Sequence, residues 1–182
     1  MKTYLETERL RLREFTLEDK KQITLLDSDP DVVRHISNGV PSSKKEIDRA
    51  MKIFLTYSKK YQHKFGYWVA IEKKSSQFIG WFHMRPLKSE PDNLMKQELG
   101  YRLLKEFWGK GYATEGTRAL IQKAFHEYNV KEVFAHAMKT NTTSQKVMLK
   151  CGLKFLREEI YEEYPGPDKQ CVWYQMTNPD FK

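Results

Sequence analysis

The sequence predicts a single α/β (α+β) domain in which helices pack on a central sheet. Segments with the period-two pattern of strands alternate with segments of 3.6-residue helical period along all 182 residues. No repeat or low-complexity linker divides the chain, so residues 1–182 are expected to form one domain with a substantial core. Hydrophobic residues make up 40% and charged residues 31% of the chain, which is typical of a soluble globular protein.

The N-terminal third predicts one strand followed by helices. Residues 10–14 alternate apolar and polar side chains, as a half-exposed strand does. Thr16 and Ser43 each precede an acidic residue at the third following position, which is the spacing of a helix capping box. The first box predicts a helix to about residue 26, and Pro30 predicts the restart of a short one. The second opens a helix with apolar positions at Ile47, Ala50, Met51, Phe54, Leu55 and Tyr57.

The middle of the chain predicts strands. Residues 67–71 and 78–84 are rich in aromatic and β-branched side chains, and a short polar turn separates them, as in a hairpin. Two prolines mark residues 87–93 as a loop. Residues 98–104 are expected to form a further strand.

The C-terminal part predicts two helices and a hairpin. Residues 112–128 carry one apolar stripe and are expected to be helical. A strand over 133–138 and a helix over 141–151 follow, and Gly152 stands where a helix end requires a left-handed residue. The chain ends in a predicted C-terminal β-hairpin of residues 155–164 and 171–176, joined by the turn Pro165-Gly166-Pro167-Asp168.

The composition excludes several classes of protein. No apolar run approaches the ~20 residues of a membrane span, and the N-terminus lacks a signal peptide's apolar stretch, so we expect a cytoplasmic protein with no membrane partner. Cys151 and Cys171 are too few and too far apart for a disulfide framework or a zinc site, and no metal is predicted. The net charge of +8 comes from scattered basic pairs, which argues against a nucleic-acid partner and suits a cofactor with several phosphates.

A glycine-broken turn is the predicted phosphate site. Gly109 and Gly111 allow a sharp turn close to a ligand. A helix begins at once, so unpaired amides and the positive end of the helix dipole face the same point, and Lys110 adds a full charge. The dinucleotide fingerprint would need glycine at Thr114, and the P-loop pattern is absent. A tight strand-to-helix connection without a ligand is the alternative.

Four motifs in order resemble the GNAT superfamily of N-acetyltransferases, and most closely its branch of ribosomal-protein N-terminal (α-amino) acetyltransferases. These motifs are Glu98-Leu99-Gly100-Tyr101, Trp108-Gly109-Lys110-Gly111-Tyr112-Ala113-Thr114-Glu115, Asn141-Thr142-Thr143-Ser144 and Gly152-Leu153-Lys154-Phe155. Residues 7–13 resemble that branch's N-terminal strand, so the resemblance spans residues 5–176.

The resemblance implies both a fold and an activity. The fold is a mixed, mostly antiparallel central sheet, splayed in the middle, with helices on both faces and acetyl-CoA in the gap. The activity is direct transfer of acetyl from acetyl-CoA to a primary amine, without a covalent enzyme intermediate. The acceptor would be a protein N-terminal α-amine or a small amine, and the enzyme a monomer or homodimer.

The resemblance also assigns cofactor contacts to residues. Backbone groups of Leu103 and Leu104 would face the pantetheine arm, Asn141 would contact that arm, and Ser144 would lie near the sulfur. The implied cofactor-binding residues are Leu103, Leu104, Trp108, Gly109, Lys110, Gly111, Tyr112, Ala113, Thr114, Asn141 and Ser144. The superfamily usually has Gln or Arg where Trp108 stands, so a side-chain contact is lost and the backbone cradle is kept. Asn141 is also a good helix N-cap, which explains it without a ligand.

Acetyl transfer requires a deprotonated amine, a polarised thioester carbonyl and a stabilised thiolate. An α-amine loses its proton at pH 7 for about 1.4 kcal/mol or less, whereas a lysine ε-amine costs about 4.6 kcal/mol, so a strong base is optional for an α-amine. Glu98, at the start of the strand that enters the gap, is the predicted catalytic base, and an exposed strand carboxylate is the alternative. Ser144 is the predicted proton donor to the thiolate, because Met148 stands where many relatives carry a tyrosine; water is the alternative.

Two further questions stay open. Five strand and hairpin residues are candidates for the acceptor pocket, with core packing as the alternative: Trp68, Trp81, His83, Tyr164 and Trp173. A non-catalytic acyl-CoA-binding or sensing module on the same fold would use the same phosphate turn. An RNA-binding function lacks a recognisable motif and a concentrated basic stripe.

Overall fold

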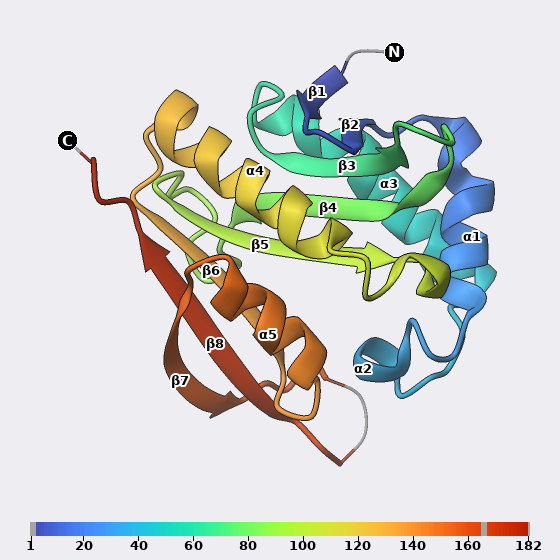
Figure 1. Cartoon of the computed structure of the whole chain (residues 1–182). Coiled ribbons are helices and arrows are strands. Elements are labelled where there is room, and N and C mark those ends of the chain that lie inside the picture. Colours follow the sequence, from blue (N-terminus) through green and yellow to red (C-terminus); the bar gives the residue numbers. More distant parts are fainter. Residues whose placement is uncertain (1–2, 165–166, 182) are drawn as a thin grey trace.

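The computed structural model describes residues 3–164 and 167–181. Its centre is an eight-stranded sheet in the order β1-β2-β3-β4-β5-β6-β8-β7 (Figure 1). The strands are β1 Thr3–Glu6, β2 Leu10–Glu14, β3 Gly66–Glu72, β4 Phe78–Pro86, β5 Lys96–Leu103, β6 Glu132–Met138, β7 Lys154–Ile160 and β8 Gln170–Thr177. The pair β5–β6 is parallel and the other neighbours are antiparallel, which confirms a mixed, mostly antiparallel sheet.

Helices cover both faces of this sheet. They are α1 Lys20–Ser28, α2 Arg34–Ser37, α3 Lys44–Lys60, α4 Tyr112–Tyr128 and α5 Thr142–Lys150, with short 3-10 turns at Leu17–Asp19 and Lys105–Phe107. In Figure 1, α4 and α5 lie in front of the sheet, and α3 lies behind it. The predicted α/β (α+β) class with helices on both faces is confirmed.

The sheet opens between β5 and β6. Pairing runs only from Lys96 opposite Glu132 to Glu98 opposite Phe134. Both strands continue beyond these residues, β5 to Leu103 and β6 to Met138. The predicted splay in the middle of the sheet is therefore confirmed, and Glu98 lies where the gap begins.

Local signals account for most element boundaries. The backbone amide of Thr16 donates to Asp19 at 2.7 Å, and that of Ser43 donates to Glu46 at 2.7 Å, so both predicted capping boxes form. Gly152 has the predicted left-handed conformation, with φ of 92°.

Three predicted boundaries differ from the structure. β1 was not predicted, because four residues give too short a pattern; it is held by pairing with β2. The short helix α2 begins at Arg34, later than predicted, because residues 29–33 form a turn. Strand β7 ends at Ile160, since residues 161–164 also turn, with the Tyr164 amide donating to the Tyr161 carbonyl at 3.0 Å. In the predicted turn at 165–168, residues 165 and 166 lie outside the described residues.

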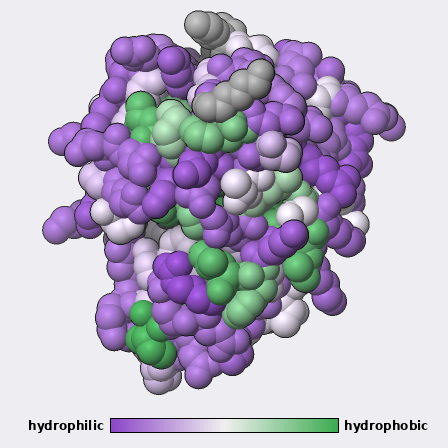
Figure 2. All heavy atoms as spheres, turned by 90° about the vertical axis from the view of Figure 1, so that its left-hand side faces the viewer, coloured by the Kyte–Doolittle hydropathy of each residue, from purple (hydrophilic) through white to green (hydrophobic). Residues whose placement is uncertain are grey.

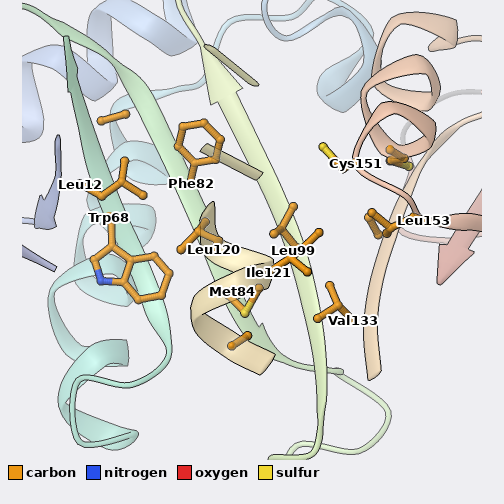
Figure 3. Close-up of a cluster of buried hydrophobic side chains, with 14 of the residues drawn as sticks. Leu12, Trp68, Phe82, Met84, Leu99, Leu120, Ile121, Val133, Cys151 and Leu153 are labelled. Atoms are coloured by element: carbon orange, nitrogen blue, oxygen red, sulfur yellow. The ribbon is translucent and has the colours of Figure 1, made fainter. Parts of the chain in front are cut away.

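The main core lies between the sheet and α4. In Figure 3, Leu120 and Ile121 of α4 lie among Phe82, Met84 and Leu99 of the strands. Gly116 permits this close approach, because a Cβ there would lie 2.4 Å from the Phe82 ring. The helix that begins at the glycine turn is thereby fixed against β4 and β5.

One face of the molecule is mostly polar. The face in Figure 2 is dominated by hydrophilic residues, and its hydrophobic patches are separate from one another. Within residues 3–164 and 167–181, no helix has both the length and the apolar character needed to cross a bilayer. Cys151 and Cys171 are both buried and free.

Candidate functional site

The glycine turn has the geometry of an anion site. Gly109 and Gly111 have φ angles of 71° and 85°, a region that favours glycine. Gly111 is the N-cap of α4, and the Glu115 amide donates to its carbonyl at 3.0 Å. The amides of the three preceding helical residues therefore have no partner within the helix. A Cβ at Gly109 would meet no atom within 4 Å, so this side of the turn is open to a ligand.

The backbone of β5 offers a second set of polar groups. The Leu104 amide donates to the Ile79 carbonyl of β4 at 2.9 Å. In an antiparallel pair, alternate residues direct their N–H and C=O groups to opposite sides, so those of Tyr101 and Leu103 point into the gap toward β6, beyond the last paired residue, Glu98. The indole N–H of Trp108 donates to the Leu103 carbonyl at 2.8 Å. The Leu103 backbone thus points into the gap, whereas the Leu104 amide is turned away from it.

A cavity of about 80 Å³ lies where β5 and β6 separate. Its lining comes from β5, β6, α4, α5 and the residue just before β7: Leu99, Gly100, Tyr101, Thr117, Ala135, His136, Ser144, Val147, Met148 and Leu153. The hydroxyl of Thr117 is buried and has no hydrogen-bond partner among the described residues. Buried polar groups are normally paired, so this hydroxyl, together with the free backbone groups of β5, fits a polar ligand in the gap.

Two hydroxyls meet at the cavity. The Asn141 side chain accepts from the Ser144 amide at 3.1 Å, so Asn141 is the N-cap of α5. This directs Ser144 toward β5, where its Oγ lies 3.4 Å from the Tyr101 Oη. Burial raises the pKa of Tyr101, so this side chain is a neutral phenol that can donate a proton. Tyr101 was not predicted as a site residue, although the period-two pattern shared with Leu103 could have placed it in the gap.

Glu98 is buried in an ion pair rather than exposed. Its carboxylate accepts from Arg85 at 2.6 Å, and the Nε2 atoms of His83 and His136 lie 3.7 Å and 3.6 Å from the same oxygen. Burial favours the neutral acid, but the two imidazoles and the Arg85 charge outweigh it and hold the pKa of Glu98 well below its usual range. This geometry makes Glu98 a fixed negative charge and a weak proton acceptor.

The two histidines differ in charge. Burial lowers the pKa of His83 to about 4, so this imidazole is neutral. Burial also opposes charge on His136, but the Cys171 sulfur and Glu98 raise its pKa to about 9. The His83 ring packs directly against Gly100 of β5. A Cβ at residue 100 would lie 2.6 Å from this ring and would clash with it, so the position requires glycine. Across the two described ranges, no group of three or more His, Cys, Asp or Glu side chains could hold a metal ion.

Four of the five acceptor-pocket candidates gather around these histidines. Trp81 stacks near His83, and Trp173 stacks on His136 with ring centroids 4.5 Å apart. The Tyr164 hydroxyl lies 2.9 Å from His136 Nδ1. Trp68 does not join them: it is fully buried and stacks on Tyr4, so core packing explains it.

Comparison with known proteins identifies the family of this chain. A family model described as acetyltransferase (GNAT) domain matches residues 9–154. The chain is also 30% identical to the FsC-acetyl coenzyme A-N(2)-transacetylase of Aspergillus fumigatus, over 97% of this chain and 77% of that protein.

Solved structures share the fold. The ribosomal-protein-S5-alanine acetyltransferase of Vibrio fischeri superposes with a TM-score of 0.77 at 20% identity, covering 98% of each chain. The spermidine N-acetyltransferase of Vibrio cholerae, solved with CoA and spermine, gives a TM-score of 0.74 at 15% identity over 96% of this chain and 99% of that one. Because the family model covers most of the chain and the fold agrees, the protein is an N-acetyltransferase that belongs to the GNAT family.

Proposed function

We propose that this enzyme transfers acetyl from acetyl-CoA directly to a primary amine, either the α-amine of a protein N-terminus or a small amine, without a covalent enzyme intermediate. One observation carries the proposal: at the opening of the sheet, two paired hydroxyls lie on one side and a fixed carboxylate lies on the other. The relative from Aspergillus fumigatus is named for transfer to an N(2) nitrogen, which supports an amine acceptor.

The donor is held in two places. Amides at the start of α4 bind the pyrophosphate, and the Leu103 backbone and Asn141 hold the pantetheine arm in the gap. The full proposed set is Leu103, Trp108, Gly109, Lys110, Gly111, Tyr112, Ala113, Thr114, Asn141 and Ser144. Leu104 is left out, because its amide and carbonyl already pair with Ile79 and Phe107. Acetyl-CoA supplies the activated acetyl group.

On the acceptor side, the buried carboxylate of Glu98 favours attack. A neutral amine that adds to the thioester carbonyl gains positive charge on nitrogen, and Glu98 offsets the Arg85 and His136 charges that would otherwise repel it. Arg85 holds Glu98 ionised, so water rather than Glu98 takes the proton in this proposal. That arrangement suits an α-amine better than a lysine side chain. An α-amine loses its proton at pH 7 for about 1.4 kcal/mol or less, so it does not need a strong base.

On the donor side, Ser144 and Tyr101 form one proton-donating pair. The thiolate leaves next to Ser144, which gives it a proton or a hydrogen bond. When a proton is transferred, the Tyr101 phenol 3.4 Å away passes its own proton to Ser144, and water then reprotonates Tyr101. Met148 lines the same cavity and has no proton to donate.

We expect Ser144→Ala to lower kcat by about a hundredfold, the lower end of the range for general acid catalysis, with a smaller change in KM. Tyr101→Phe should lower kcat less, because Ser144 remains. The double variant Ser144→Ala with Tyr101→Phe should have about the same kcat as Ser144→Ala alone, because the two residues act as one unit. Single-turnover acetyl transfer measures these effects without product release. An unchanged single-turnover rate in Ser144→Ala would refute the role of Ser144 as the proton donor.

The function itself is tested with acetyl-CoA and a panel of amines. A ligand that binds the folded state raises Tm, so millimolar acetyl-CoA should do so. Release of free thiol with N-terminal peptides, polyamines and aminoglycosides then identifies the acceptor. Absence of a shift would contradict the cofactor site, and a shift with no thiol released by any amine would favour a non-catalytic acyl-CoA-binding or sensing module.

A further inference from the structure

Arg9 ties the start of the sheet to the glycine turn. It lies between β1 and β2, about a hundred residues before the turn, and its guanidinium donates to the Lys110 carbonyl at 2.9 Å. Its Nε donates to Glu115 at 2.6 Å, and its backbone amide donates to the other oxygen of that carboxylate at 2.9 Å. The guanidinium also lies 4.5 Å from the centre of the Tyr112 ring. One side chain thus contacts residues both before and after the second glycine of the turn.

Glu115 needs this partner for an electrostatic reason. It lies in the first turn of α4, where a carboxylate stabilises the helix dipole but would repel a pyrophosphate at the same terminus. The Thr7 hydroxyl donates to it at 2.5 Å, alongside the donors from Arg9. Burial would raise the pKa of Glu115, but these hydrogen bonds and the Arg9 charge lower it. The carboxylate is therefore ionised and is matched by one cation.

The turn also needs a partner for an entropic reason. Gly109 and Gly111 are the residues with most freedom to lose when a ligand orders them. A Cβ added at Gly109 would have no neighbouring atom within 4 Å. A Cβ added at Gly111 would lie 3.3 Å from the Arg9 guanidinium. A loop that is already fixed binds its ligand at lower cost.

We propose that Arg9 is a positioning residue of the acetyl-CoA site, which fixes the glycine turn through the Lys110 carbonyl and cancels the charge of Glu115 beside the bound pyrophosphate. This inference rests on the proposed placement of the pyrophosphate at the start of α4. It assigns a binding function to a residue that touches neither the gap nor the acceptor side of the sheet.

Arg9→Met should raise the Kd and the KM for acetyl-CoA at least about tenfold, while kcat at saturating acetyl-CoA and the KM for the amine stay close to wild type. Arg9→Lys keeps the charge but not the forked donors, so its Kd should be intermediate. The double variant Arg9→Met with Glu115→Gln should bind more tightly than Arg9→Met alone, because the unmatched carboxylate is gone.

Arg13→Met is the matched control. Arg13 lies on β2 and makes a comparable ion pair with Asp19 at 2.7 Å, away from the turn. It should lower Tm without changing the Kd for acetyl-CoA. The proposal is overturned if Arg9→Met binds acetyl-CoA like wild type, or if Arg13→Met weakens binding equally. A double variant as weak as Arg9→Met would refute the charge-cancelling role. Failure of the wild-type enzyme to bind acetyl-CoA would instead refute the proposed cofactor site.

Discussion

Gly111→Asp is expected to weaken acetyl-CoA binding by about a hundredfold, equivalent to about 2.7 kcal/mol. The new carboxylate would lie at the N-cap of α4, facing the pyrophosphate, and two like charges about 4 Å apart near a protein surface repel by about 4 kcal/mol before salt screens them. Arg9 could not fully offset this, because it already pairs with Glu115. Isothermal titration with acetyl-CoA measures the loss.

Gly111→Asn separates charge from backbone strain. Asparagine has the same shape as aspartate and tolerates a φ of 85° about as well, so both variants meet the same steric demand, including a Cβ 3.3 Å from the Arg9 guanidinium. We expect Asn to cost much less affinity than Asp, and the difference to shrink at high salt. Equal Kd values for wild type and Gly111→Asp would show that the pyrophosphate lies elsewhere.

Glu98→Ala is expected to lower the free energy of unfolding by about 3–5 kcal/mol, because it leaves the Arg85 guanidinium buried without its counter-ion. For a chain of this size the loss corresponds to a fall in Tm of roughly 6–20 °C. Since the pKa of Glu98 is depressed in the folded state, its contribution is complete above about pH 4.3 and is lost as the pH falls further. The stability difference from wild type should therefore narrow in acid.

Glu98→Gln tests the chemistry with less damage to the fold. It keeps a hydrogen-bond acceptor for Arg85 but removes the negative charge, so kcat should fall about a hundredfold, as when one preorganised electrostatic group is lost. Asp19→Ala is the control: it breaks the Arg13 ion pair away from the gap and should lower Tm while the folded enzyme keeps its kcat. If Glu98→Gln kept the wild-type kcat, the electrostatic role of Glu98 would be refuted.

Much of the fold could be predicted from the sequence, because many helix ends depend on interactions between neighbouring residues. The capping boxes at Thr16 and Ser43 and the left-handed glycine at 152 depend on neighbours within four residues, so their patterns predicted helix ends directly. The glycine turn was visible for the same reason, because its φ angles and the helix that follows are local properties. Strand β1 was not visible, because its four residues give too short a pattern without the partner β2.

The site depended on contacts between strands. Glu98 was predicted to be the catalytic base, with an exposed strand carboxylate as the alternative. The sequence does not show that Arg85, thirteen residues earlier, lies opposite it in the sheet. Tyr101 acquired a role only where α5 brings Ser144 to within 3.4 Å of it. Arg9 stood out only as part of residues 7–13, which resemble the N-terminal strand of the ribosomal-protein branch, because its partners lie about a hundred residues away.

The sequence by itself therefore determined the family, most of the helices and the glycine turn, because the motifs and patterns that predict them are formed by residues close together in the chain. The tertiary structure decided which side chains are charged and which face the gap. A pKa and a hydrogen-bond partner depend on the groups that folding brings within a few ångströms, and in this protein those groups come from β4, β6, α5 and the chain between β1 and β2.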